Sequence, residues 1–437
     1  MNMPVNARIT EDPIHMDIYQ DRSIFHDETG ETCFLEGNQS KAAKIRYTTI
    51  TDSLEANFLG NTLQRVKSEG FQDELNTNDK QLIQQLVDGI TGNVGRALVA
   101  VAVQQMAIKA ICPMQSIRLH KASNNRMSFS WQEGISMRTI DATYVSPFLR
   151  QYGLLRLNAS GAMMTRSLAE NYPYSNLYKA KLHGPRNQWL QIVDRLENGK
   201  MDPTCALEYI LSLLQNKSDI FDDKCAVAIK SLDEARDITL QKVERAVKSF
   251  LLDTDYPARA FEISLHSFMQ ALNDLGYTSQ NLVPLSQMRS ANKKHGNVGD
   301  IEVREGTDII ESWDAKYKKP YLIDELNELE DKLMTAPRVE TAGFVTDGQP
   351  DLKNDVKDKV EAIEVEFDTE VKIYSLHDWL RYQIDLNNVE SETLLAKAWL
   401  TALVESLTLH RTDIAPIDEP CEKWVEDLTR VIKRSFK

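Results

Sequence analysis

Two acidic residues and a lysine in one short segment are the residues of this sequence best suited to chemistry. Asp300 begins a run of alternating residues, and Asp314 and Lys316 close the next run after a turn centred on Gly306. Side chains of a strand alternate between faces, so Asp314 and Lys316 are expected to point the same way. Two carboxylates supply hard oxygen ligands for a divalent metal ion, and a lysine can orient water or steady charge on a phosphate. These residue types indicate metal-dependent hydrolysis of a phosphodiester.

The spacing of these residues requires a hairpin. Asp300 lies 14 positions before Asp314, which lets the second strand return beside the first and bring the two acids together. Glu262, on a predicted helix that precedes the hairpin, is a candidate for a further acid facing the same site. The alternative is that Asp300 is an ordinary strand-start residue and that Asp314 and Lys316 form an exposed pair at a sheet edge.

Other chemical motifs in the sequence are weaker. The same acid-x-lysine spacing recurs at 351–353, 355–357 and 370–372. The first two fall on a predicted helix, where residues two apart do not share a face. The third lies at the start of a strand, but no hairpin with an acidic residue at its start precedes it. The histidines form no His-x-x-x-His or Glu-x-x-His set of metal ligands, and neither a glycine-rich phosphate loop nor a Gly-x-Ser-x-Gly motif occurs.

The elements that must position these residues follow from the spacing of apolar residues. A helix over 258–275 is predicted to precede the hairpin at 299–317. A helix over 321–334, a strand over 339–346, a helix over 352–363 and a strand over 371–375 follow, and helices at 376–386, 389–409 and 420–434 close the chain. This order predicts a mixed α+β or α/β layer in which helices pack against a small mixed sheet.

The N-terminal half is expected to be rich in helices. Residues 1–50 are polar and irregular and are expected to form a loosely ordered lead-in. Helical spacing appears at 54–68 and 79–112, with a break near Gly89 to Gly95, and again at 187–198, 203–216 and 234–252. We expect three parts: a helical region at 1–115, a basic recognition and connector region at 116–255, and the catalytic domain at 256–437.

The distribution of charge points to a binding surface for an anionic polymer. The net charge of the chain is -14, yet residues 101–200 contain 13 Lys and Arg against 5 Asp and Glu, a net charge of +8. Such asymmetry concentrates positive potential on one part of an acidic molecule, as nucleic-acid binding requires. The alternative is a basic cluster on a solvated face.

A predicted hairpin at 116–134 and two short helices, at 141–151 and 160–170, suggest a helix-turn-helix or winged DNA-binding unit within this basic stretch. A basic loop over 279–298 lies beside the predicted catalytic hairpin. The candidate DNA-binding residues are those of the types that contact phosphates and base edges: Arg118, Lys121, Asn124, Asn125, Arg126, Arg138, Arg166, Lys179, Lys181, Arg289, Lys293 and Lys294. Arg and Tyr at this density also occur in ordinary domain interfaces, so that alternative stays open.

Several features favour a cytoplasmic protein. The five cysteines are scattered and form no Cys-x-x-Cys pair, which is typical of reduced thiols. The N-terminus lacks the basic start and apolar core of a signal peptide. The most apolar window, 97–112, contains two glutamines and a lysine, and we interpret it as a buried core helix.

Gly299-Asp300-Ile301-Glu302 and Asp314-Ala315-Lys316, together with a preceding helix that carries an acid, resemble the core of the PD-(D/E)XK nucleases. Gly299 stands in place of the proline of that pattern. More specifically, 303–332 and the stretch from Arg138 to Tyr174 resemble the SacI-like type II restriction endonucleases. The resemblance implies that Asp300 and Asp314 bind Mg2+, with the backbone carbonyl of Ala315 as a further ligand, and that Lys316 orients the attacking water.

The resemblance also implies a function for the whole chain. We expect a sequence-specific endonuclease that cuts double-stranded DNA and leaves 5′-phosphates, acting as a homodimer on a palindromic site beside a cognate DNA methyltransferase with which it forms no stable complex. Two alternatives remain. One is a nuclease of repair or phage defence directed by DNA structure or modification, and the other is a DNA-binding regulator without catalytic activity.

Overall fold

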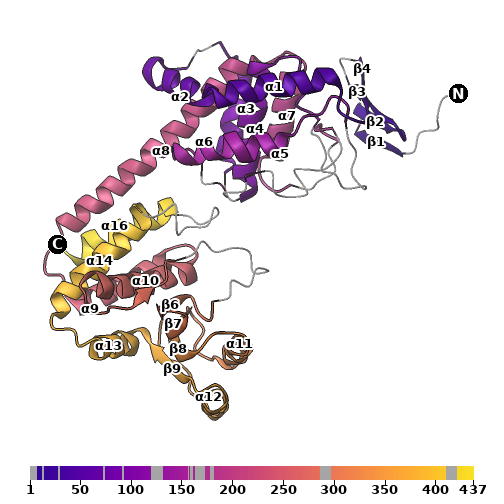
Figure 1. The fold of residues 1–437 in the computed structure, drawn as a ribbon. Coiled ribbons are helices and arrows are strands. Elements are labelled where there is room, and N and C mark those ends of the chain that lie inside the picture. The colour runs from indigo at the N-terminus through magenta and orange to yellow at the C-terminus, as the bar shows by residue number, and fades with distance from the viewer. Residues whose placement is uncertain are drawn as a thin grey trace. The chain divides into compact units, whose positions relative to one another are not determined.

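The computed structural model describes residues 7–11, 14–27, 30–71, 74–90, 93–119, 131–155, 157, 161–162, 173–177, 182–285, 297–409 and 421–437. The chain divides into two compact units, Met1–Ile220 and Phe221–Lys437. The boundary falls inside helix α8 (Pro203–Asp233). The predicted three-part division instead placed its boundaries after residues 115 and 255. Each unit is considered by itself below (Figure 1).

Unit 1 begins with an antiparallel sheet rather than with the irregular lead-in expected from the sequence. The strands β1 to β4 pair in chain order, and they are Ala7–Glu11, Ile14–Ile18, Arg22–Asp27 and Gly30–Leu35. Met16, Ile18 and Phe25 are buried with Trp131 in a small core of their own. The alternation Ile14-His15-Met16-Asp17-Ile18 places apolar and polar side chains on opposite faces, which is the pattern of a sheet with one covered face.

The rest of unit 1 is helical, as the sequence predicted. Its helical elements are α1 (Lys41–Glu55), α2 (Phe58–Glu69), α3 (Thr77–Asp88), α4 (Asn93–Ile111), α5 (Met137–Ile140), the π-turn η1 (Asp141–Val145), α6 (Ser146–Gln151), α7 (Arg186–Glu197) and the start of α8. The predicted break near Gly89 separates α3 from α4. Among the described residues, Val94–Ile111 is the window long and apolar enough to cross a bilayer, and 72% of it is buried in the structure. It packs as a core helix, as predicted.

The predicted DNA-binding unit is only partly described. Residues 116–119 form no strand, and Trp131 pairs with Glu36 as an isolated bridge. The predicted hairpin at 116–134 therefore does not appear in its described part, and the remainder, 120–130, lies outside the described residues. The helix predicted over 141–151 is present as η1 and α6. Most of the second helix, predicted over 160–170, lies outside the described residues.

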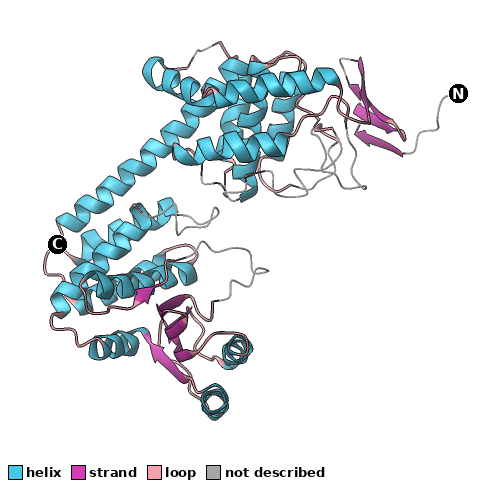
Figure 2. Ribbon diagram, viewed as in Figure 1, coloured by secondary structure: helices cyan, strands magenta, loops and turns pink. Residues whose placement is uncertain are grey.

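Unit 2 contains helices on both faces of a mixed sheet, which confirms the mixed α+β fold class (Figure 2). After the end of α8 its elements are α9 (Leu240–Asp253), α10 (Pro257–Asp274), β5 (Asn281–Leu282), β6 (Ile301–Glu305), β7 (Asp308–Lys316), α11 (Ile323–Leu333), β8 (Val339–Thr346), α12 (Asn354–Phe367), β9 (Glu370–Ser375), α13 (Leu376–Leu386), α14 (Glu392–Thr408) and α16 (Cys421–Ser435).

The sheet of unit 2 runs in the order β5-β6-β7-β8-β9. Strands β5, β6 and β7 are antiparallel neighbours, whereas β7, β8 and β9 are parallel and are connected through α11 and α12. The predicted hairpin is present, and it turns at Gly306, whose φ of 62° suits glycine. A register shift between Val303 and Arg304 marks a bulge. The carboxyl ends of the parallel strands therefore share one edge of the sheet, where β7 ends at Lys316.

Two cores hold this sheet between its helices. One joins Ile309, Phe344 and Val371 to apolar residues of α11 and α12. The other joins Ile301, Val303 and Trp313 to α10, α13 and α14. Figure 1 accordingly shows α10 and α12 on opposite sides of the strands. Strand β8 is buried at every position except Glu340, because a central strand is covered on both faces.

Candidate active site at the end of strand β7

The hairpin brings Asp300 and Asp314 together through reciprocal hydrogen bonds. Residue Ile301 of β6 lies opposite Trp313 of β7, so the two acids occupy the next position of the ladder. The backbone N–H of Asp300 donates to Oδ1 of Asp314 at 3.1 Å. The backbone N–H of Ala315 donates to Oδ2 of Asp300 at 3.0 Å. These two bonds fix both carboxylates at one end of the hairpin, as the spacing in the sequence predicted.

Gly299 makes this close approach of the two strands possible. A Cβ atom at position 299 would lie 2.6 Å from Oγ of Ser312 and 2.9 Å from the carbonyl oxygen of Trp313. Both distances are shorter than real Cβ contacts, and the second is to backbone that cannot simply rotate away. Glycine at this position therefore allows the segment before Asp300 to lie against β7.

Lys316 lies among carboxylates. Its Nζ is 3.3 Å from Oδ2 of Asp314 and forms a close ion pair with Glu325 of α11. Burial acts to lower the pKa of Lys316, but the Asp314, Glu325 and Asp300 carboxylates outweigh it and raise the pKa. The side chain is therefore a protonated ammonium that can donate hydrogen bonds. It is not a base that could take a proton from water.

Helix α11 contributes two charged residues that sequence reasoning did not identify. Glu325 pairs with both Lys316 and Lys319. Lys332 lies with its Nζ 3.7 Å from Oδ2 of Asp314. The seven-residue spacing of Glu325 and Lys332 places them on one side of a helix, and that was the available signal. Only the tertiary arrangement shows that this side faces the end of β7.

Glu262 lies close enough to interact electrostatically with the pair, but it is held by its own helix. Its carboxylate forms an ion pair with Arg259, one turn earlier on α10, and Arg259 is buried. Burial raises the pKa of Glu262, and Asp314 adds to the increase, while Arg259 opposes both. Glu262 is thus a nearby acid with one firm partner, and its participation in a metal site stays a prediction.

Asp300 is an acid whose ionisation is opposed by its surroundings. The residue is exposed, yet many protein atoms lie around its carboxyl group. This partial desolvation raises the pKa of Asp300 well above its usual value, and the charges of Asp314 and Glu262 raise it further. A cation bound beside Asp300 would relieve this repulsion, because an opposite charge favours the ionised form.

The donor set suits a hard divalent cation, although it is not fully assembled. Carboxylate and carbonyl oxygens are the ligands that Mg2+ prefers, and Asp300, Asp314 and Ala315 supply them at one strand end. Among the described residues, the only group of three or more potential His, Cys, Asp or Glu ligands within 4.8 Å of one another is elsewhere, at His15, Asp17 and His26. The carboxylate oxygens of Glu262, Asp300 and Asp314 therefore do not all lie within 4.8 Å of one another.

The competing acid-x-lysine pair at 370–372 lies on β9, two strands away from β7 in the sheet. Glu370 and Lys372 stand at the start of β9, which runs parallel to β7 through β8. Their side chains pair with each other at 2.8 Å. In the ladder Lys372 lies opposite Gly343 of β8, which lies opposite Trp313 of β7, so the intervening strand β8 separates this pair from Asp314 and Lys316.

Two of the candidate DNA-binding residues are described. Arg118 is buried, forms an ion pair with Asp194 and donates to the carbonyl oxygen of Tyr174 at 2.7 Å. This internal use of its guanidinium argues against a contact with DNA. Arg138, in α5, is exposed. The other candidates lie outside the described residues: Lys121, Asn124, Asn125, Arg126, Arg166, Lys179, Lys181, Arg289, Lys293 and Lys294.

Comparison with known proteins gives no relative: the chain matches no protein-family model and no curated protein. The candidate site therefore depends on the geometry of the hairpin and of α11. Any family assignment depends on the resemblance of short motifs.

Proposed function

We propose that this chain is a Mg2+-dependent endonuclease that cuts double-stranded DNA at a specific sequence, in the manner of a type II restriction enzyme. The observation that carries the proposal is the pairing of Asp300 with Asp314 beside Lys316 at one strand end. The order of elements around it supports a PD-(D/E)XK core: α10 with its acid precedes the hairpin, and β8, α12 and β9 follow.

In the proposed reaction, a water oxygen attacks phosphorus and gives up a proton to solvent. The bond from phosphorus to the 3′ oxygen breaks, this oxygen takes a proton from solvent, and a 5′-phosphate and a 3′-hydroxyl result. The Lys316 ammonium donates a hydrogen bond to the attacking oxygen and stabilises the negative charge that develops on the phosphate. Asp314 and Glu325 hold this ammonium from two sides. They thereby fix its direction before DNA arrives.

Mg2+ held by Asp300, Asp314 and the carbonyl of Ala315 would supply Lewis-acid stabilisation of the phosphate and of the leaving oxygen. The chain's own part is to present both carboxylates in ionised form. A cation bound beside Asp300 would offset the repulsion that raises its pKa and would favour the ionised form. The reciprocal backbone hydrogen bonds keep the two carboxylates at the same strand end.

The proposal assigns DNA binding to the basic stretch of 101–200 and to the loop of 279–298. The net charge of +8 in the former supports that assignment. A homodimer is proposed because a palindromic DNA site mirrors two-fold protein symmetry. A cognate DNA methyltransferase is proposed as the partner activity that protects the host genome.

A nuclease directed by DNA structure or modification would use the same residues for chemistry. It would differ in producing fragments whose ends share no sequence. A regulator that binds DNA without cutting it would leave DNA intact under all metal conditions. One experiment therefore separates the three functions.

The test is incubation of the purified chain with unmethylated genomic DNA, with Mg2+ or with EDTA, followed by sequencing of the fragment ends. Mg2+-dependent fragments that begin at one short motif and carry 5′-phosphates are expected. Fragments without a shared motif would favour the structure-directed nuclease. Intact DNA, with retention of the DNA by the protein, would contradict catalysis.

A further inference from the structure

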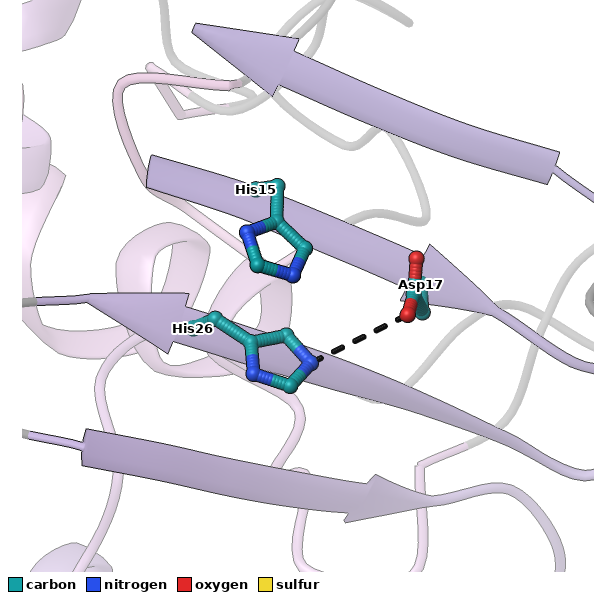
Figure 3. Close-up of side chains that lie close together, drawn as sticks. All are labelled: His15, Asp17 and His26. Atoms are coloured by element: carbon teal, nitrogen blue, oxygen red, sulfur yellow. Dashed lines mark ion pairs between the residues drawn. The ribbon is translucent and has the colours of Figure 1, made fainter. Parts of the chain in front are cut away.

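The outward face of the N-terminal sheet gathers His15, Asp17 and His26, which have no part in the proposed nuclease reaction. His15 and Asp17 lie two positions apart on β2 and therefore share a face. His26 of β3 lies directly opposite His15 in the antiparallel ladder. The other face carries Met16 and Phe25 into the core, so the polar trio is turned away from it. Figure 3 shows both imidazoles and the carboxylate on these adjacent strands.

The geometry of the trio is that of a ligand set rather than of a hydrogen-bonded cluster. One potential ligand atom from each residue lies within 4.8 Å of the others. The two imidazole rings are stacked, with centroids 4.1 Å apart and planes 11° apart. Nε2 of His26 is 3.9 Å from Oδ2 of Asp17, which is too long for a hydrogen bond. That nitrogen is buried and has no hydrogen-bond partner among the described residues.

Glu31, on the next strand, lies beside the other ring nitrogen of His26. Nδ1 of His26 is 3.2 Å from Oε1 of Glu31. A cation bound at Nε2 would leave Nδ1 as the protonated nitrogen, which faces this carboxylate. A carboxylate behind a histidine is the arrangement that orients metal-binding imidazoles.

We propose that His15, Asp17 and His26 form a site for a divalent transition metal ion, with Zn2+ as the first candidate. Two imidazoles and one carboxylate match the preferences of Zn2+, whereas Mg2+ prefers oxygen ligands alone. Ligands at about 2 Å from a tetrahedral ion lie roughly 3.3 Å apart, so a small side-chain rotation closes the 3.9 Å gap. The fourth position is left for water.

Arg8 of β1 is the competitor for this site. Its guanidinium contacts both oxygens of Asp17, at 2.5 and 2.7 Å, and its side chain is 56% exposed. A bound cation must therefore share Asp17 with Arg8 or displace it toward solvent. Metal would tie β2 to β3 through side chains, and the sheet would become more stable without any change in the nuclease site.

The test uses the full chain with Asp300→Asn and Asp314→Asn, so that the proposed nuclease site does not contribute binding. Zn2+ is titrated by calorimetry, and Co2+ by its visible absorption. We expect one equivalent bound, with affinity reduced at least about 10-fold in His15→Gln and in His26→Gln. His183→Gln, an exposed histidine of the same unit, is the matched control and should bind as its parent does.

Arg8→Gln provides a test in the opposite direction, since removal of the competitor should strengthen binding. Glu31→Gln should weaken binding about 10-fold, because the His26 ring loses its orienting partner. Circular dichroism checks that each variant is folded. Absence of stoichiometric binding in the parent, or equal affinity in the parent and both histidine variants, would overturn the proposal. In that case the trio would be a stacked histidine pair beside the Arg8–Asp17 ion pair.

Discussion

Asp300 lies where ionisation is opposed by its surroundings, since partial desolvation, Asp314 and Glu262 all raise its pKa. Such perturbation is typical of functional carboxyl groups, because a site built for a cation is electrostatically unfavourable without it. The same repulsion has a thermodynamic consequence for the metal-free protein. An acid whose pKa is higher in the folded than in the unfolded state destabilises the fold once it ionises.

Asp300→Asn is therefore expected to raise the Tm of the metal-free protein. The penalty is absent below the unfolded-state pKa of about 3.9, develops as the pH rises toward the raised folded pKa, and is complete above it. Thermal unfolding in EDTA from about pH 4 upward should show a gain in Tm that grows with pH and then levels off. A gain that does not change with pH over this range would mean that the pKa of Asp300 is not raised in the folded protein.

Lys316→Met should reduce the rate of DNA cleavage by roughly 100-fold at saturating Mg2+, the usual cost of removing a donor that stabilises transition-state charge. Lys332→Met is the matched control. Its Nζ lies 3.7 Å from Asp314 but the residue is not assigned to the reaction, so a much smaller loss is expected. Single-turnover cleavage of a labelled duplex measures both rates. Equal losses of cleavage rate in the two variants would contradict a specific role of Lys316 in the reaction.

At the scale of elements, the site is a junction of a hairpin, a helix and one glycine. Helix α11 presents Glu325 to Lys316 at the end of β7, and Gly299 lets the segment before Asp300 approach Trp313. Neither Glu325 nor Gly299 contacts the reacting phosphate in the proposed mechanism. Both residues fix the positions of the residues that do.

Glu325→Gln should lower the cleavage rate about 10-fold, because Lys316 loses the partner that fixes its direction. Glu328→Gln, one turn along the same helix, is the control. Glu328 is mostly exposed and pairs only with Lys332 among the described residues, so little change is expected. The two variants lose the same charge from one helix. If they lose activity equally, the position of Glu325 beside Lys316 is irrelevant.

Gly299→Ala is expected to destabilise the protein by about 1–3 kcal/mol, since the new methyl group must displace the backbone of Trp313. Activity should fall further than stability explains, because Asp300 follows directly. Gly348→Ala, where a Cβ meets nothing within 4 Å, is the control. Urea unfolding and cleavage rates of both variants provide the comparison. Full activity of Gly299→Ala would contradict the close approach.

The sequence predicted the elements of unit 2 well where local signals were strong. The bounds of β8 and α13 agree with the predicted ranges, because a strand rich in valine and threonine and an amphipathic helix with a Ser375 cap have clear sequence patterns. The N-terminal sheet was missed, since its strands are only five or six residues long and lie in a polar segment. Glu325 could not be assigned, because its function exists only through tertiary contact with Lys316.

At the scale of the whole molecule, the acidic chain concentrates positive charge in residues 101–200. Arg118 shows that part of this charge stabilises unit 1 internally. Arg138 is exposed and remains a candidate for contact with DNA. Substitution of Arg118 is therefore expected to affect stability, whereas substitution of Arg138 is expected to affect DNA binding.

Arg118→Ala should destabilise unit 1 by roughly 3 kcal/mol, as expected when one partner of a buried ion pair is removed. Arg138→Ala together with Arg166→Ala should weaken DNA binding and reduce its dependence on salt concentration. Thermal unfolding and binding titrations at several salt concentrations distinguish the two effects. An unchanged salt dependence in the double variant would place the DNA elsewhere.

The central claim, that Asp314 and its partners hydrolyse DNA, is tested most directly by comparing Asp314→Asn with Asp308→Asn in single-turnover cleavage with Mg2+. Both substitutions remove one negative charge from β7, the first at the end that carries the proposed site and the second at its start beside the turn. Asp308→Asn should cut DNA at the rate of the parent, and Asp314→Asn should show no cleavage above background. Cleavage by Asp314→Asn at the parent's rate would contradict the account.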